Sequence, residues 1–130
     1  MRQIKYILIA ENPADESGAR SLCNLGYHYV VNSEGLVFTP TDLHQPGMFL
    51  PIKGRETEKL NRCSIGVLYN HSLQPSPATQ RPREILKDVL EDLRNQFPTA
   101  KILGVSEYDE HFIRVNPEMN RLRMELSDLP

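Results

Sequence analysis

Residues 25 to 38 have the sequence Leu25-Gly26-Tyr27-His28-Tyr29-Val30-Val31-Asn32-Ser33-Glu34-Gly35-Leu36-Val37-Phe38. An aromatic and β-branched run is followed by a polar turn and then by a second short apolar run. Such side chains suit the half-buried surface of a pleated sheet. Gly35 can adopt the positive φ that a tight turn requires. The stretch therefore predicts a β-hairpin from Tyr27 to Phe38, with Tyr27 and Tyr29 on one face and His28 on the other.

The segments around this hairpin predict strands and helices in one chain. Ile4 to Ala10 is apolar on both faces, which indicates a central strand, and Cys63 to Tyr69 and Lys101 to Val105 are two further predicted strands. Thr79 to Phe97 carries apolar residues at spacings of three and four and predicts an amphipathic helix that ends before Pro98. Pro117 to Leu126 predicts a terminal helix. We expect an α/β fold, in which one domain spanning residues 1–130 has a mixed sheet covered by helices.

Two connections are less regular. Ala19 to Leu25 predicts a short helix that ends at Gly26. Thr39 to Asn61 is rich in proline, glycine and polar residues and shows no clear periodicity, so we expect a long functional or mobile loop.

Composition excludes several functions. The 130 residues carry a formal net charge of -2 and a pI near 6.1, which provides no basic surface for nucleic acid or anionic membrane. The apolar runs are too short to span a bilayer. The basic, apolar start mimics a signal peptide, but acidic residues follow directly, so the cytoplasm is the default location. Cys23 and Cys63 permit one disulfide, although two reduced thiols fit this location better.

Three motifs carry a family resemblance. Gly26 to Val31, with the polar turn and glycine that follow, resembles the central hairpin of the type 2 N-acetylmuramoyl-L-alanine amidases. This family includes phage lysozyme-like amidases and the peptidoglycan recognition proteins. Arg62 to Val67 is similar to the family's Asn-Ser-Ile-Gly-Ile strand, and Gln96 to Pro98 is similar to its Tyr-Pro or Phe-Pro helix end. The resemblance covers most of the chain and implies an amidase-like fold.

The same resemblance implies that the family's zinc ligands are missing. Where the family has Ile-Val-Ile-His, this chain ends its strand with Ala10. Val105 stands at the histidine of Gly-His-Arg-Asp, and Asn116 stands at the Cys or Asp before proline. Alanine and valine have no donor atoms, and an asparagine amide is a poor zinc ligand. We therefore expect no zinc, no other cofactor and no catalysis by the family mechanism, so whether the chain is an enzyme stays open.

Three residues are candidates for ligand contacts. Tyr27 matches the family's active-site tyrosine, Arg114 stands two residues before the third ligand position, and His71 follows a strand at an edge where family members contact substrate. The resemblance implies binding of peptidoglycan fragments, with no nucleic acid or membrane partner. Two alternatives stay open: an active amidase that uses other ligands, and a protein-interaction module whose groove is closed by the loop from Thr39 to Asn61.

The remaining polar residues have less specific interpretations. We expect His28 to be a hydrogen-bonded sheet histidine and His44 to be solvated. Glu107 to His111 could offer metal donors, but a solvated acidic loop is the simpler interpretation. Arginines interleaved with acids, including Arg83 and Arg123, suit a solvated surface or a groove for an anionic ligand.

Overall fold

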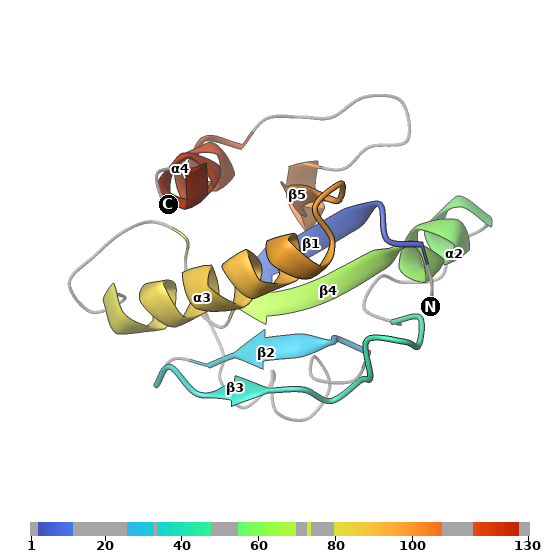
Figure 1. The fold of residues 1–130 in the computed structure, drawn as a ribbon, viewed down its shortest axis with the longest axis horizontal. Coiled ribbons are helices and arrows are strands. Elements are labelled where there is room, and N and C mark those ends of the chain that lie inside the picture. Colours follow the sequence, from blue (N-terminus) through green and yellow to red (C-terminus); the bar gives the residue numbers. More distant parts are fainter. Residues whose placement is uncertain are drawn as a thin grey trace.

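The computed structural model describes residues 3–11, 26–32, 34–47, 55–69, 73, 80–107 and 116–127. Their strands form a five-stranded sheet in the order β3-β2-β4-β1-β5 (Figure 1). The strands are β1 (Tyr6–Glu11), β2 (Tyr29–Val31), β3 (Val37–Phe38), β4 (Ser64–Tyr69) and β5 (Lys101–Gly104). The helices are α2 (Arg55–Arg62), α3 (Gln80–Gln96) and α4 (Pro117–Ser127), with a 3-10 turn η3 (Val105–Glu107).

The sheet is mixed. Strand β1 pairs in parallel with β4 and β5, β2 pairs in parallel with β4, and only β3 runs antiparallel, against β2. Strand β1 therefore lies between two neighbours, as its apolar residues on both faces predict. The expected α/β fold, a mixed sheet covered by helices, is confirmed.

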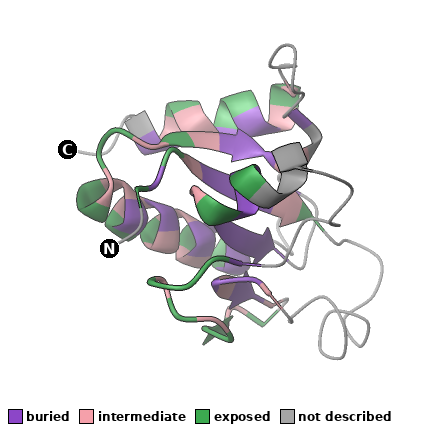
Figure 2. Ribbon diagram, turned by 90° about the vertical axis from the view of Figure 1, so that its right-hand side faces the viewer, coloured by how far each residue is buried: buried purple, intermediate pink, exposed green. Residues whose placement is uncertain are grey.

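The two faces of the sheet pack against different elements. Ile7 and Ile9 belong to the largest core cluster, which includes the buried leucines of α3 and the buried residues of α4. Leu8 points to the other face, where it packs with Leu60 of α2 and Leu103 of β5. In Figure 2 the strands are mostly buried, whereas the helices alternate buried with exposed residues. This alternation is the mark of elements that cover a core on one side only.

The predicted hairpin forms, but it lies at the edge of the sheet. Asn32 Oδ1 accepts hydrogen bonds from the backbone N–H groups of Glu34 and Leu36, both at 2.9 Å. Gly35 has φ of 81°, as the turn requires. The prediction that Tyr27 and Tyr29 share a face is wrong. Because Tyr27 precedes β2, the two-residue alternation does not extend to it.

The helices agree with their sequence patterns in two cases and correct the prediction in a third. Helices α3 and α4 begin and end within two residues of the predicted bounds. Helix α2 occupies the end of the segment from Thr39 to Asn61, where we expected a loop. Its sequence, RETEKLNR, consists largely of good helix formers but has a single apolar residue, so no apolar stripe reveals it.

The predicted helix from Ala19 to Leu25 lies outside the described residues, and so does Cys23. Cys63 lies in the turn before β4, and its Sγ is 3.7 Å from the Leu60 carbonyl oxygen. No helix in the described part of the chain combines the length and apolar character needed to cross a bilayer.

Candidate functional site

A pocket of about 300 Å³ opens where the carboxyl ends of β1 and β5 meet the start of α4. Ligands of open α/β sheets bind preferentially at this edge, because the loops that leave parallel strands diverge there. The lining residues are Ile9, Ala10, Glu11, Leu73, Gly104, Val105 and Met119. They come from β1, β5, η3, α4 and the connection after β4, so long-range strand pairing assembles the site.

The structure brings some of the sequence-predicted residues to this pocket. Ala10 and Val105 both line it. Asn116 directly precedes α4, whose Met119 lines the pocket. Tyr27 is 9% exposed and lies with Val30 and Leu68 in a small cluster against which Ala10 packs. His71 and Arg114 lie outside the described residues.

Asn116 is a helix cap in this structure. Its Oδ1 accepts hydrogen bonds from the backbone N–H groups of Glu118 at 2.8 Å and Met119 at 3.3 Å. An asparagine in this position satisfies N–H groups that have no partner within the helix. The side-chain oxygen of Asn116 is therefore already hydrogen-bonded to the backbone of α4.

Glu11 is the charged residue among the described lining residues, and it was not among the residues predicted from the sequence. It is the last residue of β1 and is exposed to solvent. Its Oε2 accepts a hydrogen bond from the backbone N–H of Leu73 at 2.9 Å. The available signal was a carboxylate directly after an apolar parallel strand, at the edge where sites form.

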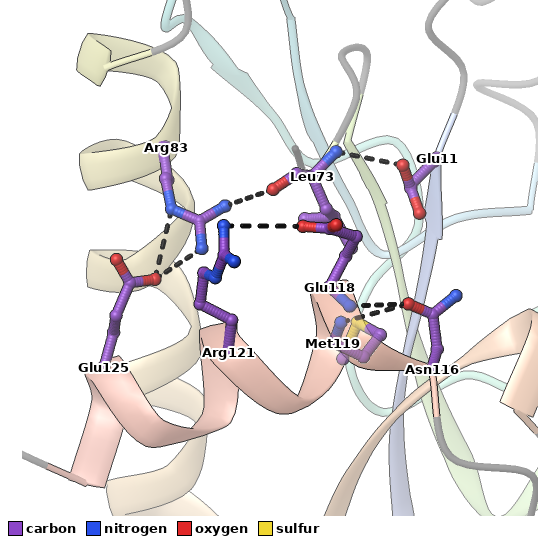
Figure 3. A network of polar contacts seen from close by, with 8 residues as sticks. All are labelled: Glu11, Leu73, Arg83, Asn116, Glu118, Met119, Arg121 and Glu125. Atoms are coloured by element: carbon purple, nitrogen blue, oxygen red, sulfur yellow. Dashed lines mark hydrogen bonds and ion pairs between the residues drawn. The ribbon is translucent and has the colours of Figure 1, made fainter. Parts of the chain in front are cut away.

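Leu73 is held from both sides. While Glu11 accepts from its N–H, Arg83 Nη1 donates to its carbonyl oxygen at 2.7 Å (Figure 3). Arg83 also donates from Nε and Nη2 to Glu125 of α4. Arg83 is 6% exposed, so the expectation of a solvated arginine is wrong for this residue. The network connects β1, the connection after β4, α3 and α4.

A second ion pair, between the buried Glu107 and the partly exposed Arg123, supports the other side of the pocket. Glu107 is 1% exposed, and its Oε1 and Oε2 accept from Arg123 Nη1 and Nη2 at 2.6 and 2.9 Å. Its carboxylate also accepts from the backbone N–H groups of Gly104 and Asn116. The prediction of a solvated acidic loop is therefore wrong at Glu107, because four donors replace its water. Residues 108–111 of that loop lie outside the described residues.

These contacts set the protonation of Glu107. Burial raises its pKa, but the hydrogen bonds from Arg123 and from the two backbone N–H groups outweigh burial and hold the pKa below its ordinary value of 4.5. The carboxylate is thus ionised and fixed in orientation at neutral pH. It ties β5 to the start of α4, the two elements that flank the pocket.

The described lining does not fit a hydrolytic zinc ion. Zinc sites of that kind use three ligands chosen from imidazole, thiolate and carboxylate. Ala10 and Val105 provide no donor atom, the Asn116 oxygen caps α4, and Glu11 is a single carboxylate. Within the described ranges, no group of three or more His, Cys, Asp or Glu side chains is placed to hold a metal.

A second pocket of about 360 Å³ lies beside the start of β2. It is lined by His28, Tyr29, Thr39, Thr41, Asp42, Leu43 and His44. His28 is completely buried, and both of its ring nitrogens are hydrogen-bonded, as expected of a sheet histidine. His44 is exposed, as expected. The described part of the long loop thus lines this pocket and not the one at β1 and β5.

Comparison with known proteins supports the fold. The chain is similar in structure to the N-acetylmuramoyl-L-alanine amidase LysC from Clostridium intestinale URNW, with a TM-score of 0.65 and 12% sequence identity. The match covers 95% of this chain and 87% of that one. No protein-family model and no curated protein sequence matches the chain. The likeness establishes an amidase-like fold across almost the whole chain.

Proposed function

We propose that this chain is a single amidase-like domain that has lost zinc-dependent N-acetylmuramoyl-L-alanine amidase activity and binds peptidoglycan fragments. The observation that carries the proposal is an amidase-like fold whose pocket at β1 and β5 has no zinc-binding set among the described residues. A hydrolytic zinc ion lowers the pKa of its bound water and polarises the scissile carbonyl. Without its ligands the fold keeps a pocket but loses that chemistry.

The positions of three residues support the loss of zinc. Ala10 and Val105 stand where the resemblance expects histidines, and both line the same pocket. Asn116 stands where it expects the third ligand, beside that pocket at the start of α4. Residues that are far apart in sequence thus gather at one edge, as replacements of one ligand set should.

Three residues are our proposed ligand contacts. Tyr27 belongs to the cluster against which Ala10 packs, and a tyrosine hydroxyl can donate to a carbonyl of the ligand. Arg114 could bind a carboxylate through two hydrogen bonds, and His71 comes two residues after the last residue of β4 in the sequence. Peptidoglycan fragments carry amides and carboxylates that suit such groups.

Metal content and ligand binding test this proposal together. The protein is purified without chelator, and its zinc is measured by elemental analysis before and after zinc incubation and desalting. Binding of soluble muropeptides is measured by isothermal titration calorimetry on the same sample. We expect no retained zinc and measurable binding.

Each contrary result selects another function. Zinc retained near one per chain, with release of peptide from muropeptide, would establish an active amidase with other ligands. If the protein binds neither zinc nor muropeptides, that result would favour a protein-interaction module.

A further inference from the structure

We propose that the pocket at β1 and β5 binds the free amino end of a peptide that begins with a small apolar residue, and that Glu11 recognises the ammonium group. The inference rests on the proposed function and specifies its ligand. It distinguishes peptides already released from the glycan from peptides still attached to it, whose first nitrogen is an amide.

The shape and chemistry of the pocket select a small apolar group. Apart from Glu11 and Gly104, the lining residues that the structure describes are aliphatic or thioether: Ile9, Ala10, Leu73, Val105 and Met119. A methyl group placed among these side chains gains from leaving water. Gly104 cannot take a side chain without moving Met119, because a Cβ there would lie 2.9 Å from Met119 Cγ. Glycine therefore keeps this wall of the pocket open.

Glu11 provides a fixed negative charge at the edge of this apolar surface. The hydrogen bond from Leu73 N–H to Oε2 orients the carboxylate. The other oxygen, Oε1, has no hydrogen-bond partner in the described part of the chain and can accept from a ligand. An ammonium that donates to an oriented carboxylate makes a charge-assisted hydrogen bond, which is stronger than a bond between neutral groups.

The neighbouring cations do not cancel this charge. Arg83 is bound to Glu125 and to the Leu73 carbonyl, and Arg123 is bound to Glu107. Arg121 extends away from α4, and its Nη1 is 4.0 Å from Glu118 Oε2 (Figure 3). Among the described lining residues the charge is therefore that of Glu11, which favours an ammonium at this side of the pocket.

One peptide end matches this description closely. Hydrolysis of an N-acetylmuramoyl-L-alanine bond releases an L-alanine amino terminus, which has a methyl group and an ammonium on the same carbon. In the intact fragment the same nitrogen is acylated and neutral, so it cannot pair with Glu11. A domain with this pocket would bind the peptide product of amidase cleavage in preference to the uncleaved fragment.

Calorimetry with matched ligands tests the inference. The probes are the dipeptide L-alanyl-D-isoglutamine, its N-acetyl derivative and its N-acetylmuramoyl derivative. The proteins are the full parent chain, Glu11→Gln and Glu84→Gln, a control on the exposed face of α3. We expect the free dipeptide to bind the parent at least about tenfold more tightly than either acylated form, a difference typical of one charged hydrogen bond. Glu11→Gln should abolish this preference, and Glu84→Gln should retain it.

The outcomes separate the inference from the proposed function. Equal or tighter binding of the N-acetylmuramoyl form by the parent would overturn the inference and leave fragment binding intact. No binding of any probe would overturn both. Gln can still accept from Leu73 N–H, so the variant should fold. If it does not, the comparison of the three ligands on the parent chain decides alone.

Discussion

At the residue scale, His28 joins two parts of the backbone that are distant in sequence. Its Nδ1 accepts from the Gly66 N–H at 3.0 Å, and its Nε2 lies 2.8 Å from the Gln45 carbonyl oxygen. Its backbone N–H donates to the Gly66 carbonyl at 2.9 Å. Because Nδ1 accepts, the ring proton is on Nε2 and points to Gln45. Both nitrogens are thus committed to structure, which leaves neither for a metal.

Replacing His28 should therefore destabilise the fold in a graded way. His28→Leu leaves the buried Gly66 N–H without an acceptor, and we expect a loss of about 1–3 kcal/mol in the free energy of unfolding. His28→Asn keeps a side-chain acceptor near the Nδ1 position and should lose less. Urea unfolding of the two variants measures the difference. Equal losses would show that the Gly66 bond contributes nothing.

Glu107 should make the stability depend on pH. Its pKa is lowered in the folded chain, so its contribution is full above the ordinary value of 4.5 and is lost as pH falls through the lower, folded value. Glu107→Gln removes the carboxylate that pairs with Arg123, and we expect a loss of about 3 kcal/mol near neutral pH. Unfolding measured at neutral and at acidic pH should show that the parent approaches the variant in acid. A gap that is unchanged or wider in acid would contradict the assignment.

At the scale of elements, local sequence patterns predicted the features that depend on contacts between residues close in sequence. The stripe of α3 and the turn glycine of the hairpin both depend on contacts a few residues apart, and both were confirmed. Arg83 lies three residues before the buried Leu86, so its position on the stripe already indicated burial. Its partners were not predictable, because Leu73 and Glu125 belong to other elements. Helix α2 was missed for lack of an apolar stripe.

The cap of α4 offers a test at this scale. Asn116→Ala removes the acceptor for the N–H groups of Glu118 and Met119, and we expect a loss of about 1 kcal/mol in the free energy of unfolding. Asn116→Asp retains a capping oxygen and should stay close to the parent. Thermal or urea unfolding compares the two. A destabilisation of the same size in both variants would show that the side chain does not act as a cap.

At the scale of the whole molecule, the candidate site exists only because β1 and β5 pair in parallel. Ala10 and Val105 could be placed together from the sequence only through a family resemblance, since no local pattern links them. The resemblance did not select Glu11, Leu73 or Glu107, because their roles depend on hydrogen bonds between different elements: Glu11 with Leu73, and Glu107 with Arg123 of α4. The hairpin was predicted as a unit, but its place at the edge depends on which strand β2 pairs with.

Alkaline pH should weaken the centre of this sheet. Burial raises the pKa of Tyr69 to about 12, with Glu11 adding to the increase and Arg83 opposing it. Because the folded value exceeds the unfolded value of 10.0, this contribution is complete below pH 10 and is lost as pH rises through about 12. We expect the parent to lose about 1 kcal/mol more than Tyr69→Phe by about pH 11. Equal losses would contradict the assignment.

The proposed loss of the zinc ligands leads to a gain-of-function test of the whole architecture. If Ala10, Val105 and Asn116 occupy the three ligand positions of an amidase-like fold, then donors introduced there should converge on one metal. The variant Ala10→His, Val105→His, Asn116→Asp supplies two imidazoles and a carboxylate, a set that suits zinc, and aspartate still caps α4. We expect it to retain zinc near one per chain after desalting, whereas the parent and each single variant retain none. A triple variant that folds like the parent but retains no zinc would show that the three positions do not form one site. The proposal that this fold has lost a zinc centre would then have to be abandoned.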